Sequence, residues 1–148
     1  MSVYKKLLQR ELAKVPIKVG VIGAGQMGFG MIAQISRIPG MIVAGICDVN
    51  IDAAQRAGDY YKSQSSGKGN VIITNDFRKV IQATEVEVVV DATGIPEVGA
   101  NISMEALLAK KHLVLLNVEV DITIGSIMYQ MFENAGLVYT GSAGDEPA

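Results

Sequence analysis

The chain has 148 residues, of which 49% are hydrophobic and 19% charged, and its formal net charge is −2. The length suits a single domain with a substantial core, and the slightly acidic balance excludes the global basic field of a nucleic-acid-binding domain. A single cysteine, Cys47, excludes an internal disulfide framework, and no apolar run reaches the length of a membrane span.

The apolar content is high for a domain of this size, with a mean hydropathy of +0.31. A parallel sheet covered by helices on both faces requires a high apolar content. A surface that is covered by a second domain or subunit raises the apolar content further. We expect both, and therefore a homo-oligomer in the full-length protein. Residues 1–16 contain lysines but no continuous hydrophobic segment, so they are not a secretory signal, and we expect a cytoplasmic protein.

Residues 1–15 are assigned to an N-terminal segment, in which residues 3–14 are predicted to form an amphipathic helix packed outside the main sheet. The apolar residues at helical spacing are Tyr4, Leu8, Leu12 and Val15. Basic residues lie on the other side of this helix, and Glu11 interrupts their run. We interpret that basic face as solvated, rather than as a membrane or phosphate patch.

From Pro16 onward, apolar strands alternate with helices, which is typical of an α/β domain. The expected strands are 17–23, 41–48, 71–74, 86–93, 112–119 and 137–141. The expected helices are 26–38, 51–61, 76–83, 96–111 and 122–135, with a polar connector at 62–70. Pro96 and Glu97 suit a first helical turn, and Gly136 suits a C-terminal cap. The pattern predicts a Rossmann-type doubly wound parallel sheet of about six strands over residues 16–143, in the order 3-2-1-4-5-6.

The stretch VGVIGAGQMGFGM, residues 19–31, places four glycines where the first strand meets the next helix. Gly23, Gly25 and Gly28 form the pattern G-x-G-x-x-G, which alone could serve only close packing of helix on strand. In a dinucleotide turn, the first glycine permits the tight turn, the second admits a pyrophosphate and the third packs the helix against the sheet. Gly30 lies outside the pattern, and we expect it to serve close packing of the helix.

Asp48 ends the second expected strand, about 20 positions after Gly28, which is the spacing of a carboxylate that binds the adenosine ribose. The helix N-terminus between them offers unpaired N–H groups and a positive dipole end to phosphates. The other expected cofactor contacts here are Ala24, Gln26, Met27 and Val49. A carboxylate at Asp48 favours NAD over NADP, although Arg56 in the next helix leaves NADP open.

The later strand ends supply further candidates. Ala92, Thr93 and Gly94, in the sequence DATG, are small enough for a nicotinamide ring to pass close to the backbone. The alternative is an ordinary turn in which Thr93 starts the next helix, and the two roles are compatible. Asn117 and Glu119 alternate along one face of the fifth strand's end, where Glu119 either faces substrate or is structural.

Several residues are not assigned to chemistry. We expect Asp121 to cap a helix, Cys47 to be a small core residue and His112 to lie on the surface at the end of the sheet opposite the cofactor. The sequence has no His/Cys cluster for a metal, no Ser-His-Asp arrangement and no P-loop lysine. No catalytic residue is assigned.

Five segments together carry a resemblance to a known family: PIKVGVIGAGQMGFGMIAQI, PGMIVAGICD, DATGIPEVGA, NVEVDITIG and GLVYTGSAGDEPA. They resemble the N-terminal domain of the homoserine-dehydrogenase-like oxidoreductases. More narrowly, they look like the branch that carries a C-terminal SAF domain and includes the 1-deoxy-D-xylulose 5-phosphate reductoisomerase-like enzymes. The resemblance implies that the three glycines hold the pyrophosphate, that Asp48 binds the ribose and that Thr93 and Gly94 lie beside the nicotinamide. It places Asn117 and Glu119 at the pocket mouth.

The resemblance also implies an activity: NAD- or NADP-dependent oxidation or reduction of a small polar, in some members phosphorylated, carbonyl or hydroxyl compound. Residues 144–148 then begin the crossover into a catalytic domain, with the family's catalytic lysine beyond Ala148. The alternative hypothesis is a non-enzymatic Rossmann module that senses NAD(H) or another nucleotide.

Overall fold

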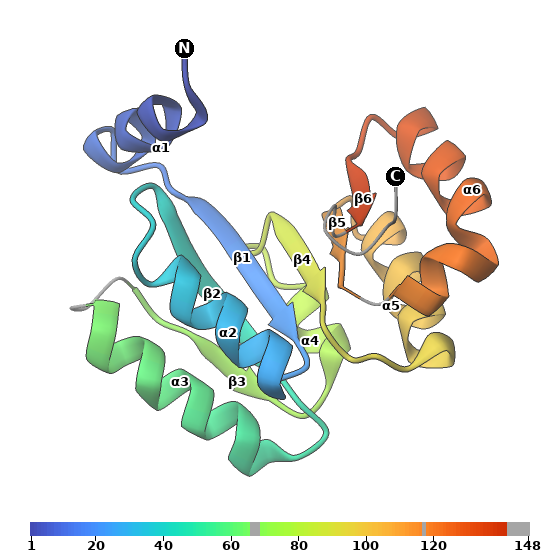
Figure 1. Cartoon of the computed structure of the whole chain (residues 1–148), viewed down its shortest axis with the longest axis horizontal. Coiled ribbons are helices and arrows are strands. Elements are labelled where there is room, and N and C mark those ends of the chain that lie inside the picture. Colours follow the sequence, from blue (N-terminus) through green and yellow to red (C-terminus); the bar gives the residue numbers. More distant parts are fainter. Residues whose placement is uncertain (66–68, 117, 142–148) are drawn as a thin grey trace.

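The computed structural model describes residues 1–65, 69–116 and 118–141, and it describes residues 118–123 by their backbone alone. Six parallel strands form one sheet in the order β3-β2-β1-β4-β5-β6, as predicted (Figure 1). The strands are β1 (Ile17–Ile22), β2 (Met41–Cys47), β3 (Ile72–Thr74), β4 (Val88–Asp91), β5 (His112–Leu115) and β6 (Tyr139–Gly141). The order reverses between β1 and β4, so a crevice opens beyond their carboxyl ends.

Helices cover both faces of this sheet, which defines the Rossmann-type α/β architecture (Figure 1). The helices are α1 (Val3–Leu12), α2 (Gln26–Ile35), α3 (Ile51–Ser65), α4 (Phe77–Ile81), α5 (Pro96–Leu108) and α6 (Val118–Asn134). One apolar cluster joins the strands to α2 and α3, and a second joins them to α4, α5 and α6. Because both faces are buried, the central strands are almost unbroken runs of Val and Ile.

Helix α4 approaches the sheet over two glycines that face each other across β1 and β2. The pairing of these strands shifts by one residue, so that Gly20 pairs with Gly45. A Cβ added to Gly20 would lie 2.5 Å from a methyl group of Val80, which is fully buried. On the opposite helix layer, the Tyr61 hydroxyl accepts a hydrogen bond from the Val43 N–H at 3.0 Å.

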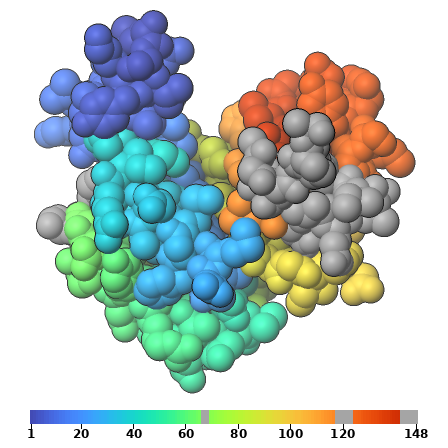
Figure 2. Space-filling view, in the orientation of Figure 1, coloured from blue at the N-terminus to red at the C-terminus, as the bar shows by residue number. Residues whose placement is uncertain are grey.

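Helix α1 is present, but its apolar residues do not pack as expected. No residue of the helix is buried, and Tyr4 and Leu12 are 60% and 83% exposed. The helix meets the domain at Gly40, where the Leu7 backbone lies close by and the Glu11 carboxylate accepts a hydrogen bond from the Gly40 N–H at 2.6 Å. The helix therefore projects from the body of the domain, as Figure 2 shows in dark blue.

The prediction of a strand over 112–119 is wrong beyond Leu115. Strand β5 pairs with β4 from His112 to Leu115, and it ends where β4 ends at Asp91. Helix α6 then begins at Val118, so Glu119 lies in a helix rather than at a strand end. Asp121 lies inside the same helix rather than just before its first residue, where a capping residue was expected.

Other boundaries shift by a few residues. Helix α3 continues through Ser65, into the segment expected to be a connector, and the Ser65 hydroxyl donates to the Tyr61 carbonyl. Helices α2 and α5 end three residues before their expected ends, and β4 spans four residues rather than 86–93. The expected helix signals are confirmed, because Pro96 opens α5 and Gly136 follows α6 with a φ of 73°.

Gly30 does not serve close packing, contrary to expectation. The residue is exposed in the middle of α2, and a Cβ built there would meet no atom within 4 Å. Glycine in such a position costs backbone entropy on folding without any compensating contact.

Replacing Gly30 by alanine is therefore expected to stabilise the domain. The free energy of unfolding should rise by about 0.5–1 kcal/mol, the usual difference between glycine and alanine inside an exposed helix. Urea denaturation followed by circular dichroism measures this change. A lower midpoint than that of the wild type would contradict the assignment of Gly30 as uncontacted.

Candidate functional site

The glycine turn after β1 lies between the ends of two neighbouring strands. Gly23 has a φ of 100°, which side-chain-bearing residues rarely adopt, and a Cβ there would lie 2.7 Å from the Ala92 carbonyl. Its N–H donates to the Cys47 carbonyl at 2.7 Å. Gly23 thus makes the tight turn that its place in the pattern predicts.

The other two glycines of the pattern lie in opposite environments. Gly28 is buried, and a Cβ there would lie 1.7 Å from the Gly23 carbonyl oxygen, so α2 rests directly on the turn. Gly25 is exposed at the N-cap of α2, and a Cβ there would meet nothing within 4 Å. The first N–H groups of a helix have no acceptor inside it, and at α2 no side chain caps them.

Asp48 follows β2 directly and joins the two turns on either side of it. Its Oδ2 accepts a hydrogen bond from the Ala24 N–H at 2.7 Å, and its Oδ1 accepts one from the Asn50 N–H at 2.8 Å. The carboxylate therefore lies beside the glycine turn, at the edge where a ribose would meet it.

The turn after β4 is held by Asp91, a carboxylate with no exposed surface. Its Oδ1 accepts from the Thr93 N–H at 2.9 Å and from the Thr93 hydroxyl at 2.8 Å. The Thr93 oxygen in turn accepts from the Ile95 N–H at 3.4 Å. The N-cap of α5 is Ile95, so Thr93 orders the turn before the helix rather than starting it.

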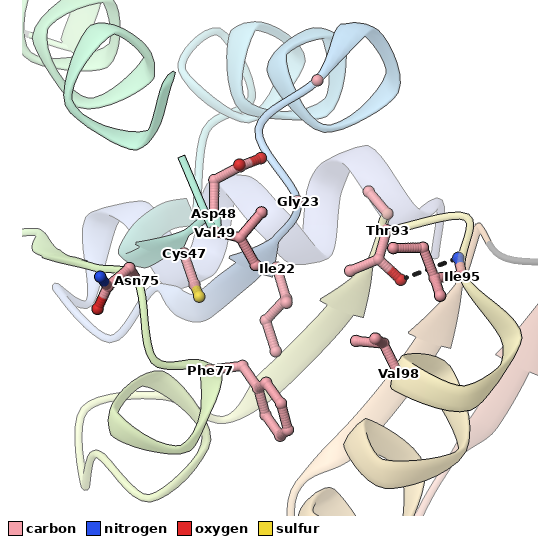
Figure 3. Close-up of a pocket in the computed structure, with 12 residues that line it drawn as sticks. Ile22, Gly23, Cys47, Asp48, Val49, Asn75, Phe77, Thr93, Ile95 and Val98 are labelled. Carbon is pink, nitrogen blue, oxygen red and sulfur yellow. Dashed lines mark hydrogen bonds between the residues drawn. The ribbon is translucent and has the colours of Figure 1, made fainter. Parts of the chain in front are cut away.

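These turns surround a pocket of about 200 Å³ at the carboxyl ends of β1, β2, β3 and β4 (Figure 3). Its lining residues are Ile22, Gly23, Gly25, Cys47, Asp48, Val49, Asn75, Phe77, Ala92, Thr93, Ile95 and Val98. Asp48 lies on one side of the pocket and Thr93 on the other, and Phe77 and Val98 form apolar walls (Figure 3). The pocket thus combines an apolar interior with a carboxylate at its rim.

Six of the residues expected from the sequence line this pocket: Gly23, Gly25, Asp48, Val49, Ala92 and Thr93. Five more belong to the same turns without lining it: Ala24, Gln26, Met27, Gly28 and Gly94. Asn117 lies outside the described residues, and the side chain of Glu119 is not described.

Sequence reasoning missed the apolar walls of the pocket. Phe77 comes from the first turn of α4, and Ile95 and Val98 come from the start of α5. Each follows the carboxyl end of a strand, and that placement is the signal that could have identified them. Asp91 was recognised as the end of a strand, in the sequence DATG, but it was given no role, and its complete burial is unusual for a carboxylate.

Cys47 lies in the floor of the pocket and is 3% exposed, as expected of a core residue. Burial, followed by the negative charges of Asp48 and Asp76, raises the pKa of its thiol to about 12. This pKa exceeds that of the same thiol in the unfolded chain, so folding favours the protonated thiol. The stabilisation that this thiol gives the folded state is therefore complete below pH 9.0 and is lost as the pH rises toward 12.

Cys47 should therefore resist alkylation in the folded protein. At pH 8, iodoacetamide is expected to react at least about 100-fold more slowly than with the unfolded chain, because the reactive species is the thiolate. Mass spectrometry of samples with and without guanidinium chloride measures both rates. Equal rates would contradict the buried placement of the thiol.

The described part of the chain contains neither a cluster of metal ligands nor a membrane-spanning helix. No group of three His, Cys, Asp or Glu residues lies close enough there to hold a metal ion. Among the helices described, none has the length and apolar character needed to cross a membrane.

A doubly wound sheet, a glycine turn under a helix N-terminus and a carboxylate after β2 define a dinucleotide-binding domain of the Rossmann class. The sequence model of the family described as dihydrodipicolinate reductase, N-terminus, matches residues 17–116, and the chain belongs to this family. The chain is therefore an NAD(P)-binding Rossmann domain, and the expectation of NAD or NADP as cofactor is confirmed.

Other comparisons agree on the fold. A glycosyl hydrolase family 109 protein of Streptomyces coelicolor is 29% identical over 101 residues, which are 67% of this chain and 21% of that protein. A homoserine dehydrogenase from Thiobacillus denitrificans has a TM-score of 0.71 at 22% identity, over 85% of this chain and 29% of the other. A myo-inositol dehydrogenase from Lactobacillus casei, in complex with NAD(H) and myo-inositol, has a TM-score of 0.69 at 20% identity, over 86% and 36%. The chain thus spans about a fifth of this curated relative and about a third of these structures.

Proposed function

We propose that the chain is the cofactor domain of an oxidoreductase that acts on a small polar carbonyl or hydroxyl compound. The observation that carries this proposal is the pocket between Asp48 and Thr93, which opens beside the glycine turn. An apolar pocket of about 200 Å³ with a carboxylate at its rim suits the base and ribose of a nucleotide.

The residues present fit a dinucleotide along this crevice. The adenine would pack between Val49, Phe77 and Val98, and Asp48 would accept hydrogen bonds from the ribose hydroxyls. The diphosphate would lie over Gly25, facing the N–H groups of Gln26 and Met27 at the start of α2. These residues follow β1, β2, β3 and β4, so the fold itself assembles the site.

The nicotinamide half would continue from Thr93 past Gly94 toward β5. Asn117 and Glu119, from the sequence prediction, remain proposed contacts of this half. When bound, the nicotinamide supplies the hydride chemistry, and the protein supplies binding and orientation. The Thr93 hydroxyl donates its proton to Asp91, so it presents an acceptor oxygen on this wall.

The proposed substrate class follows the relatives that share the fold, which include a homoserine dehydrogenase and a myo-inositol dehydrogenase. Because the chain spans 29% and 36% of those structures, we propose that further sequence supplies the group that transfers the proton. A SAF-domain branch, a homo-oligomer and a cytoplasmic location are narrower parts of the same proposal.

Calorimetric titration with NADH and NADPH tests the cofactor preference. NADH is expected to bind at least about fivefold more tightly at low salt, because the Asp48 carboxylate repels a 2′-phosphate. Stronger binding of NADPH would overturn the preference for NAD. The absence of heat with either cofactor at millimolar concentration would overturn the proposed function.

A further inference from the structure

We infer that Asp48 is a positioning residue, which holds the glycine turn in its binding conformation before any cofactor is present. This inference rests on the proposed function, but it concerns a contact inside the protein rather than the ribose contact. The contact is the hydrogen bond from the Ala24 N–H to Asp48 Oδ2, at 2.7 Å.

This bond extends the pairing of β1 with β2 beyond the last paired residues. The N–H of Gly23 donates to the Cys47 carbonyl, and the N–H of the next residue, Ala24, donates to the side chain of Asp48. The turn is thus attached to β2 at two successive positions, and the second attachment is made by a carboxylate. A bond to a charged acceptor is about twice as strong as one between neutral groups.

The turn needs such an attachment because glycines flank Ala24 on both sides. Glycine has more backbone freedom than any other residue, so the segment Gly23–Gly25 has many alternative conformations. Ala24 is 7% exposed, and its N–H would lose its acceptor without the carboxylate. An unsatisfied buried N–H is costly, so the turn would rearrange to hydrate it.

The same carboxylate also holds the other rim of the pocket. Its Oδ1 accepts from the Asn50 N–H, and Asn50 Oδ1 accepts from the N–H of Asp52 at the start of α3. Each carboxylate oxygen has a second lone pair, so both protein bonds leave acceptor capacity for ribose hydroxyls. Asp48 can therefore hold the turn and bind a ribose at once.

The bond to Ala24 also determines which backbone N–H groups of the turn are free to bind a ligand. The Ala24 N–H is occupied by Asp48, so the N–H groups at the start of α2 remain for a diphosphate. Losing Asp48 would loosen this arrangement and lower affinity by removing preorganisation. The loss would extend to nucleotides that have no ribose hydroxyl for Asp48 to bind.

The test uses ADP and 2′,3′-dideoxyadenosine diphosphate, which lacks both ribose hydroxyls, with the wild-type protein, Asp48→Ala and Asp48→Asn. If Asp48 acted on the ribose alone, the dideoxy nucleotide would bind Asp48→Ala as well as the wild type, or more tightly, since a negative charge is removed. We expect Asp48→Ala to bind the dideoxy nucleotide at least about fivefold more weakly. Equal or tighter binding would overturn the inference.

Asp76→Asn is the matched control. Asp76 is near enough to raise the pKa of the Cys47 thiol, but its side chain caps α4 by accepting from the Arg78 N–H. This variant removes the same charge and should bind the dideoxy nucleotide no more weakly than the wild type. Weakening equal to that of Asp48→Ala would overturn the inference, because loss of charge would then explain both variants.

Amide exchange in the nucleotide-free protein gives a readout that is independent of binding. The Ala24 N–H should exchange at least about tenfold faster in Asp48→Ala, while the N–H groups of Val21 and Ile46 in the strands keep their rates. An unchanged rate at Ala24 would overturn the inference even if nucleotide binding fell. If the wild type bound no nucleotide, the proposed function would fail, and the exchange rates would still decide the role of Asp48.

Discussion

Replacing Gly28 by alanine is expected to lower the free energy of unfolding by about 3 kcal/mol or more, at the upper end of overpacking effects. The added Cβ would lie 1.7 Å from the Gly23 carbonyl oxygen and 2.7 Å from its carbonyl carbon. Both are backbone atoms of a turn that is fixed on its other side by Ala92. Neither side can yield without moving α2 off the sheet.

Thermal or urea denaturation of the two variants Gly28→Ala and Gly30→Ala measures this effect against a matched control. The two positions share one helix and receive the same methyl group, but only Gly28 faces the turn. We expect destabilisation at Gly28 and a small gain at Gly30. Similar changes at both positions would show that helix propensity, rather than the contact with Gly23, controls stability here.

Features that follow from hydrophobic periodicity, motif spacing and local backbone constraints could be predicted before the structure was known. The alternation of apolar strands with helices predicted the six parallel strands and their order. The spacing from Gly28 to Asp48 assigned the glycine turn and the carboxylate to one dinucleotide site, and the bond from Ala24 to Asp48 places them side by side. Pro96 and Gly136 marked helix ends because their backbone constraints act locally.

Features that depend on tertiary pairing could not be predicted in this way. The apolar run from His112 ends as a strand at Leu115, because its partner β4 stops at Asp91. Helical spacing in α1 suggested a buried face, yet no residue of the helix is buried, and the helix meets the domain at Gly40 through the Leu7 backbone and the Glu11 carboxylate. Phe77 reaches the pocket only because the crossovers bring the start of α4 to the carboxyl ends of β1 and β2.

Replacing Gly25 by valine should abolish cofactor binding while leaving the domain folded. The residue is exposed, its φ of −72° is accessible to any residue, and a Cβ there meets nothing within 4 Å. Loss of a good N-cap costs about 1 kcal/mol. A branched side chain would fill the space over the start of α2 in which we place the diphosphate. We expect NADH affinity to fall by at least about 100-fold, which corresponds to about 2.7 kcal/mol.

Gly30→Val provides the control, because it places the same side chain in the same helix at another exposed position with free space around it. Calorimetry should show wild-type NADH affinity for Gly30→Val and no measurable heat for Gly25→Val, with similar far-ultraviolet spectra for both. Retained binding by Gly25→Val would move the diphosphate away from the N-terminus of α2. In that case the pocket would hold a nucleotide by its base and ribose alone, because the side of the crevice formed by Asp48 and Phe77 does not depend on Gly25.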